Sequence, residues 1–163
     1  MPTSTRSRPS PSPDLRPDPI VAARQALMAL CVAATKMELE QAYANIGPGP
    51  SAEDLRRSES GLVMLRGRMG GDGRAFNLGE ATVTRAAIRL SDGRTGFAYQ
   101  LGRDSEKARI SAILDALCQG VEREAVETAL APIRRRVETE ALAKARRVAA
   151  TKVDFFTMVR GED

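Results

Sequence analysis

The pair Asp92-Gly93, set between two runs of β-forming residues, constrains the fold of this chain more than any other feature of the sequence. Asp-Gly between alternating strand formers is a strong signal for a β-hairpin closed by a two-residue type I′ turn. Such a turn predicts an apolar hairpin face with three cross-strand pairs: Ile88 with Phe97, Ala86 with Tyr99, and Thr84 with Leu101. We expect this face to meet the core, because register decides which side chains point inward.

The opposite face of the predicted hairpin carries arginines beside small residues. Its pairs are Arg89 with Gly96, Ala87 with Ala98, and Arg85 with Gln100. One interpretation is a solvated, charged sheet face. The other is an interface or an anion site, because a guanidinium offers planar, bidentate hydrogen bonding to carboxylates and phosphates, and small neighbours leave room for such a group.

The rest of the sequence surrounds this hairpin with helical patterns. A further strand is expected over 61–69, followed by a glycine-rich turn over 70–73, and the hairpin strands over 80–90 and 95–101. Helices are expected from Pro19 behind an Asp18 cap, over 36–45, from Asp104 to Cys118, and over 121–152, where Pro132 should kink or restart the helix. The fold class is therefore α+β, an antiparallel β-sheet (residues 61–102) flanked by N-terminal and C-terminal helices.

The two ends of the chain differ from its middle. Residues 1–18 are rich in Pro, Ser and Arg, which predicts a disordered tail, and residues 19–163 are expected to form a single domain. Near the other end, the apolar run over 153–159 includes Phe155, Phe156 and Met158. Apolar side chains gathered at a terminus must dock, either on their own domain or on a partner.

The residue types available limit the chemistry of the chain. It has 163 residues and no histidine, which removes the commonest general base, the commonest metal ligand and every histidine-dependent nucleophile. Cys31 and Cys118 lie far apart in apolar helical stretches, typical of two buried free thiols in a reducing compartment. No apolar run is long enough to span a bilayer, and the N-terminus lacks a signal-peptide core, so we expect a cytoplasmic protein with no membrane contact.

The candidate ligand or interface residues are polar groups in and around the predicted sheet. They are Arg66, Arg68, Asn77, Glu80, Arg85 and Arg103. The segment 76–85 gathers several of these groups around Gly79, as in a polar turn that enters a strand, a polar site, or a subunit contact. The net charge of +4 also permits a basic nucleic-acid-binding module, but the basic clusters are short and lack interleaved aromatics, so this is the weaker interpretation.

The run GLVMLRGRMGGDGRAFNLGEATVTRAAIRLSDGRTGFAYQLGRD (61–104), with the closing VDFFTMVRG (153–161), resembles the PhnG family, a subunit of the bacterial carbon–phosphorus lyase system. The resemblance extends from about Pro19 onward, with helices before and after these motifs as the family has them. The chain departs from many relatives in having Lys107 where they have histidine, which argues against obligatory histidine chemistry in this subunit.

The resemblance implies a subunit of a two-fold complex with PhnH, PhnI and PhnJ. That system transfers a phosphonate to the ribose of ATP and releases adenine, and a radical subunit carrying an iron–sulfur cluster and S-adenosylmethionine later breaks the carbon–phosphorus bond. The family implies no catalytic residue, metal ligand or cofactor for this subunit, so a scaffold or substrate-shaping role is expected. The alternative is a directly catalytic subunit, with Glu80 as a base and Arg85 as a phosphate clamp.

Overall fold

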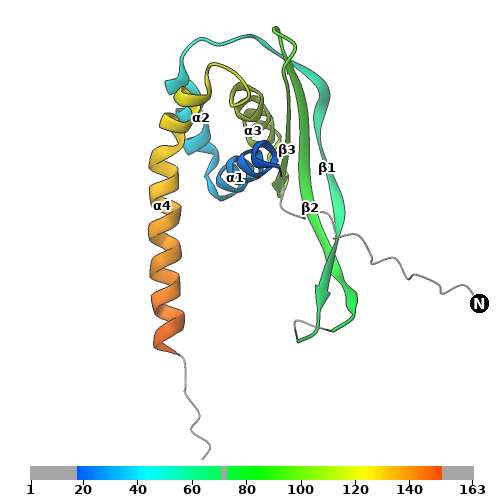
Figure 1. Ribbon diagram of the computed structural model, residues 1–163. Helices are drawn as coiled ribbons and strands as arrows, with labels where there is room; N and C mark the ends of the chain where they lie inside the picture. Colours follow the sequence, from blue (N-terminus) through cyan, green and yellow to red (C-terminus); the bar gives the residue numbers. More distant parts are fainter. Residues whose placement is uncertain (1–17, 71–72, 152–163) are drawn as a thin grey trace, which may run out of the picture.

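The computed structural model describes residues 18–70 and 73–151 and confirms the α+β class, with helices on both sides of the sheet in sequence (Figure 1). The predicted tail over residues 1–17 and the predicted docking residues Phe155, Phe156 and Met158 lie outside the described residues. In chain order the elements are α1 (Pro19–Ala33), α2 (Lys36–Ile46), β1 (Ala52–Arg68), β2 (Ala75–Leu90), β3 (Thr95–Leu101), α3 (Ser105–Leu117) and α4 (Arg123–Ala150). No helix within the described ranges is long and apolar enough to cross a membrane.

The sheet is antiparallel with the strand order β1-β2-β3. β1 and β2 form a long two-stranded ribbon that runs from the pair Ala52–Leu90 to the pair Arg68–Ala75. β3 pairs only with the helix-backed half of β2, over 83–89. Both long strands begin earlier than predicted, at Ala52 and Ala75. The prediction missed these residues because most of them are exposed and show no alternation of burial.

The hairpin at Asp92-Gly93 is present, but the predicted register is wrong by one residue. The loop has three residues, since the Leu90 N–H donates to the Arg94 carbonyl at 2.8 Å and Gly93 takes a positive φ of 92°. A three-residue loop that ends on a left-handed glycine is the next commonest hairpin connection. The pairs are therefore Ile88 with Gly96, Ala86 with Ala98, and Thr84 with Gln100.

This shift turns β3 over, because successive side chains of a strand point to opposite faces. Ile88, Ala86 and Thr84 do face the core as predicted, but their partners across the strand are small or polar. Phe97, Tyr99 and Leu101 lie on the other face, which is exposed, and they pair there with Ala87, Arg85 and Val83.

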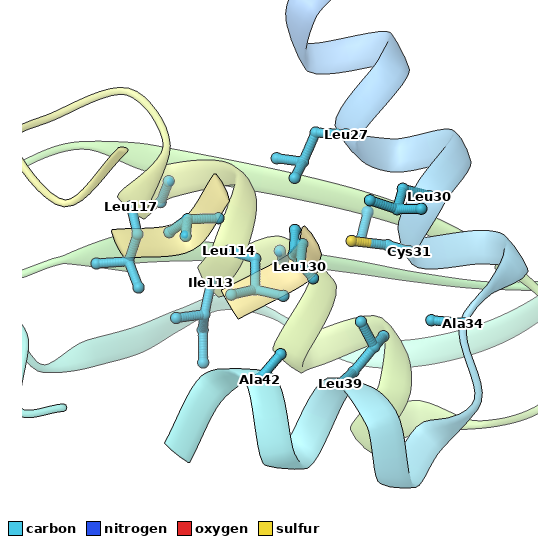
Figure 2. Close-up of a cluster of buried hydrophobic side chains, with 14 of the residues drawn as sticks. Leu27, Leu30, Cys31, Ala34, Leu39, Ala42, Ile113, Leu114, Leu117 and Leu130 are labelled. Atoms are coloured by element: carbon cyan, nitrogen blue, oxygen red, sulfur yellow. The ribbon is translucent and has the colours of Figure 1, made fainter. Parts of the chain in front are cut away.

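The core forms where α3 lies across the helix-backed half of the sheet. α3 is buried along its second half, from Ser111 to Leu117, and α1, α2 and the start of α4 close over it. Gly96 permits this close approach, because a Cβ on Gly96 would lie 1.9 Å from the carbonyl oxygen of Ala112. Figure 2 shows the resulting cluster, in which side chains from all four helices meet: Leu27, Leu30, Cys31, Ala34, Leu39, Ala42, Ile113, Leu114, Leu117 and Leu130.

Local caps set where the first three helices begin. The Asp18 carboxylate accepts the Ile20 N–H at 2.8 Å, and Asp104 accepts the Lys107 N–H at 2.9 Å, so both predicted caps are confirmed. Thr35 and Glu38 form a reciprocal capping box at α2, which satisfies two otherwise unpaired N–H groups. The structure confirms that helices start at Pro19 and Lys36, as predicted. These starts could be predicted because each depends on a capping motif only a few residues long.

α4 runs through Pro132 as one helix, so the predicted restart at this proline is wrong. Val126, Leu130 and Ile133 are buried on both sides of the proline, and this packing holds the helix together although Pro132 donates no backbone hydrogen bond. Every residue from Glu138 onward in the described helix is exposed. Figure 1 shows this half of α4 extending away from the other helices.

Candidate subunit interface

One face of the sheet is left uncovered by the described part of the chain. We call it the outer face and define it by its apolar members: Val63, Leu65, Val83, Phe97, Tyr99 and Leu101. Tyr99 and Leu101 are 58% and 66% exposed, and Phe97 is 49% exposed. A contiguous aromatic and aliphatic patch of this kind marks an interaction surface in a folded protein.

The charged groups of the outer face largely neutralise one another. Arg85 stands beside Tyr99, and its Nε donates to the Glu59 carboxylate at 2.7 Å. The same carboxylate also accepts from Arg56 at 3.1 Å. These ion pairs are exposed and contribute little to stability, but they leave the outer face with an apolar centre and a polar edge.

The open edge of β3 is capped by side chains of the α3 segment. The Phe97 N–H donates to the Asp115 carboxylate at 3.0 Å, and Gln119 Nε2 donates to the Thr95 carbonyl at 2.8 Å. Asp115 is itself held by Arg24 through two hydrogen bonds, at 2.9 and 2.5 Å. Because these contacts occupy the edge where a foreign strand would pair, a partner fits the face of the sheet better than this part of its edge.

The far half of the ribbon, beyond the helices, also exposes apolar side chains on its two strands. Leu62 and Met64 of β1 and Leu78 of β2 are each more than half exposed, and Phe76 is 42% exposed. No helix packs on this part of the ribbon within the described residues, and Figure 1 shows it extending past them. A two-stranded ribbon is marginal by itself, so this segment is a second candidate contact surface.

Four of the six predicted site residues lie along this ribbon half. Arg66 is paired across the strands with Asn77, and Arg68 donates to the Gly73 carbonyl at 3.2 Å. Glu80 is paired with Met64. These four residues lie on the face that farther along bears α3, because the register irregularity between Leu65 and Arg66 keeps Asn77 on the same side as Glu80, and all of them are exposed.

The remaining two predicted residues lie elsewhere. Arg85 is on the outer face, and Arg103 follows β3 in an exposed turn before α3. The structure therefore distributes the six residues along the ribbon, on the outer face and in a turn, without a common pocket. Among the described residues, no group of three His, Cys, Asp or Glu side chains is placed to hold a metal ion.

A groove of about 690 Å³ lies between α1 and α4. Leu27 and Leu130 line its floor, and Arg24, Arg123 and Arg134 surround it. Arg24 is committed to Asp115, and Arg123 donates to Glu127 at 2.9 Å. Sequence reasoning missed this groove, because no short motif joins two helices that lie about a hundred residues apart in the chain.

The two thiols offer no reactive group. Cys31 is buried among the helices, and this burial raises the pKa of its thiol to about 12. Cys118 is half-buried at the end of α3, and burial also raises its pKa. Because the thiolate is the nucleophilic form of cysteine, both side chains stay protonated and inert near neutral pH, as predicted for structural free thiols.

Sequence reasoning also missed Arg94, which organises the hairpin end of the sheet. Its guanidinium binds Asp92 at 2.5 Å and Glu122 at 2.7 Å, and it donates to the Leu117 carbonyl at 3.2 Å. These contacts join the hairpin to the end of α3 and the start of α4. Arg94 holds the pKa values of both carboxylates below their usual range, so the cluster stays ionised at neutral pH.

Two comparisons relate this chain to known proteins. A family profile described as "Phosphonate metabolism protein PhnG" matches residues 22–161. A relative from Rhizobium meliloti (strain 1021), named "Alpha-D-ribose 1-methylphosphonate 5-triphosphate synthase subunit PhnG", is 49% identical over 144 residues, covering 88% of this chain and 92% of the relative. On both grounds, the chain belongs to the PhnG family of phosphonate metabolism proteins.

Proposed function

We propose that this chain is a subunit of an alpha-D-ribose 1-methylphosphonate 5-triphosphate synthase, in which it serves as a scaffold or substrate-shaping component. The observation that carries the proposal is the 49% identity to a protein of that name over 92% of that protein's length. In this function the complex transfers a phosphonate to the ribose of ATP and releases adenine, within carbon–phosphorus bond cleavage.

The surface of the chain supports a role inside a complex. The outer face and the far half of the ribbon expose large apolar side chains, including Leu101, Leu62 and Leu78. In a chain that works by itself, such exposed side chains would lower solubility, whereas in a subunit neighbouring subunits would cover them. We propose that these neighbours are the PhnH, PhnI and PhnJ subunits in a two-fold arrangement.

The chemistry of the chain supports a non-catalytic role. Glu80 and Arg85 point to opposite faces of β2, because they are five positions apart on a regular stretch of strand. Within one copy of this chain they cannot act on the same bound group, which weakens the alternative of Glu80 as a base with Arg85 as a phosphate clamp. We place ATP, the iron–sulfur cluster and S-adenosylmethionine on other subunits, with no cofactor held by this one.

Two free thiols also fit a reducing compartment, so we propose that the complex works in the cytoplasm. The basic composition of the chain is then a feature of its docking surfaces, and a nucleic-acid-binding role remains the weaker candidate. No concentrated patch of cations with interleaved aromatics is found among the described residues.

Co-expression with the neighbouring phosphonate subunits tests this function. The chain should co-elute with them as a complex of defined mass, and release of adenine from ATP plus methylphosphonate should require it. The preparation without this chain is the control, and adding the purified chain back should restore the reaction. A chain that remains alone on the column, or a reaction that runs equally well without it, would contradict the proposal.

A further inference from the structure

The exposed half of α4, residues 138–150, is a helix without a covering surface in the described part of the chain, and we call it the α4 arm. The first half of α4 packs on α1, α2 and α3 through Val126, Leu130 and Ile133. The arm has no buried residue, and Leu142 and Val148 are 61% and 62% exposed. An isolated helix of this length is marginal in water, and helices usually gain their stability from packing.

The arm carries an apolar arc that starts at one edge of the stripe that packs the core and extends beyond it. At 3.6 residues per turn, five of the arm's apolar side chains occupy an arc about 120° wide around the helix axis, while Ala143 and Ala150 lie on the far side. In order around the arc they are Val148, Ala141, Ala145, Ala149 and Leu142. The centre of this arc, at Ala145, is turned by about 90° from the core-facing stripe of Val126, Leu130 and Ile133. Val148 lies in line with Leu130, so one edge of the arc continues the stripe, whereas the centre of the arc and its Leu142 edge form a further surface. The small alanines of the arc allow close approach of another helix.

Cations flank the arc on both sides. Lys144 lies next to the Val148 side of the arc and Arg146 next to the Leu142 side, each about 40° away around the helix. The arm begins with Glu138, which lies within the angular range of the arc, and Glu140. Beyond them its charged residues are Lys144, Arg146 and Arg147, all of them cations. Two arms packed together along this cationic part would bring like charges into contact, which is unfavourable between helices.

We propose that the α4 arm docks into an apolar groove, rimmed by Asp and Glu carboxylates, on another protein subunit of the complex. The alanine arc would lie in the groove, with Lys144 and Arg146 facing the two acidic rims. This is the usual way in which an amphipathic helix binds a partner, with apolar anchors in a groove and charges that fix its position. The arm contains no Phe, Tyr or Trp for stacking on bases or for anchoring at a lipid interface, which favours a protein partner.

The inference rests on the proposed function, since it needs the other synthase subunits. The test is therefore made on the full complex, with two alanines that lie two residues apart on opposite sides of the arm. Ala145→Glu places a carboxylate at the centre of the arc, whereas Ala143→Glu places the same carboxylate about 160° away. Glu favours helix about equally at both positions, and circular dichroism of the two purified chains should be the same.

We expect Ala145→Glu to weaken assembly with the other subunits at least tenfold, measured by titration of the labelled chain into the remaining complex, and Ala143→Glu to leave it within about twofold of wild type. A second pair tests the charge. Lys144→Glu should weaken assembly several-fold, and more strongly at low salt, whereas Arg147→Glu on the far side should change it little.

Each other outcome overturns the inference. If wild type assembles but both alanine variants assemble equally well, the arm is not a docking surface, and the proposed function stands. If Lys144→Glu strengthens assembly, the groove is not acidic. If the isolated wild-type chain is a dimer that Ala145→Glu separates, a second copy covers the arm. If the isolated chain binds plain duplex DNA with a steep salt dependence that Lys144→Glu abolishes, the arm is a nucleic-acid surface. If wild type does not assemble at all, the proposed function itself fails.

Discussion

The two halves of β2 both carry apolar side chains but have different surroundings. From Thr84 to Leu90 the strand alternates between buried and exposed residues, because α3 covers one of its faces. From Ala75 to Glu80 every residue is exposed, although Phe76 and Leu78 are as apolar as the residues of the core. The side chains between Thr84 and Leu90 that are buried pack in the core, whereas those from Ala75 to Glu80 are not buried by any described part of this chain.

α4 repeats this contrast within one helix. Its first half is fixed to the body by buried residues and by Arg136, which binds the Glu38 carboxylate at 2.7 and 2.9 Å. Its second half is the exposed α4 arm. The molecule is thus a small packed body with two extensions, the ribbon and the arm. Stability should depend on the body, and the work of a subunit should depend on the extensions.

The largest effect is expected when the same glycine-to-alanine substitution is made in the body and in the ribbon, and the free energies of unfolding are compared. A Cβ on Gly96 would meet the Ala112 carbonyl oxygen at 1.9 Å and the Ala116 nitrogen at 2.8 Å, so α3 would have to shift. We expect Gly96→Ala to lower the free energy of unfolding of the isolated chain by about 3 kcal/mol, measured by urea denaturation.

Gly61 in β1 is the matched control, since a Cβ there would find no atom within 4 Å. Gly61→Ala should change stability by less than about 0.5 kcal/mol, and a small gain is expected from the stiffer unfolded chain. Equal losses at the two positions would mean that the ribbon is packed as tightly as the body.

Helix starts could be predicted from the sequence, whereas the register of the hairpin could not. Helix starts followed from Asp18 and Asp104, because a cap acts within one helical turn. The register of the hairpin did not follow from its turn residues. Arg94 is held by Glu122, 28 residues away, and Gly96 fits beneath α3, and both contacts favour the three-residue loop. Such long-range contacts leave no local trace in the sequence.

The candidate site was harder to predict than the fold. The arginine-bearing face of the predicted hairpin had two interpretations, a solvated sheet face or an interface or anion site, and Arg85 does lie on an exposed face. Its neighbours across the sheet are Tyr99 on β3, where the predicted register placed Gln100, and Glu59 on β1. Because one residue of register moves every side chain of β3 to the other face, the aromatic outer face could not be predicted from a turn motif.

The second prediction separates stability from assembly on the outer face. Tyr99→Glu should leave the unfolding free energy of the isolated chain within about 0.5 kcal/mol, because this side chain packs on no core element. It should weaken assembly with the other synthase subunits at least tenfold, about 1.4 kcal/mol, since aromatic anchors dominate interfaces. The chain's other tyrosine, Tyr43 on α2, is the control, and Tyr43→Glu should assemble normally. If both variants assemble like wild type, the outer face is not an interface.

The third prediction concerns the joint between α4 and the body, by which we mean the ion pair of Arg136 with Glu38. Hydrogen bonds from Arg136 and from the Thr35 cap lower the pKa of Glu38 from 4.5 to about 2. Because the folded pKa is below the unfolded one, this carboxylate stabilises the fold above about pH 4.5, and the contribution is lost as the pH falls toward 2. Wild type should therefore lose more stability between pH 5 and pH 3 than Glu38→Gln does, measured by the urea midpoint.

Glu124→Gln, at an exposed position in the first turn of α4, serves as the control for this joint, and it should keep the acid sensitivity of wild type. An equal loss of stability in wild type and in Glu38→Gln over this pH range would show that the joint does not depend on the ionised carboxylate.

The smallest effect is expected at Arg85, and it decides between scaffold and catalyst. The ion pair of Arg85 with Glu59 is about half exposed on both sides, so Arg85→Gln should cost less than about 0.5 kcal/mol in the isolated chain. If the chain shapes the complex without taking part in the chemistry, the assembled variant should release adenine with a kcat within about twofold of wild type. If Arg85 clamps a phosphate in the transition state, kcat should fall by a factor of about 10² or more. Glu80→Gln, on the opposite face of β2, provides the matching test for a base. If both variants assemble fully and both lose most of their kcat, Glu80 and Arg85 must contribute to one site from opposite faces of this strand, which requires two copies of the chain or a second subunit.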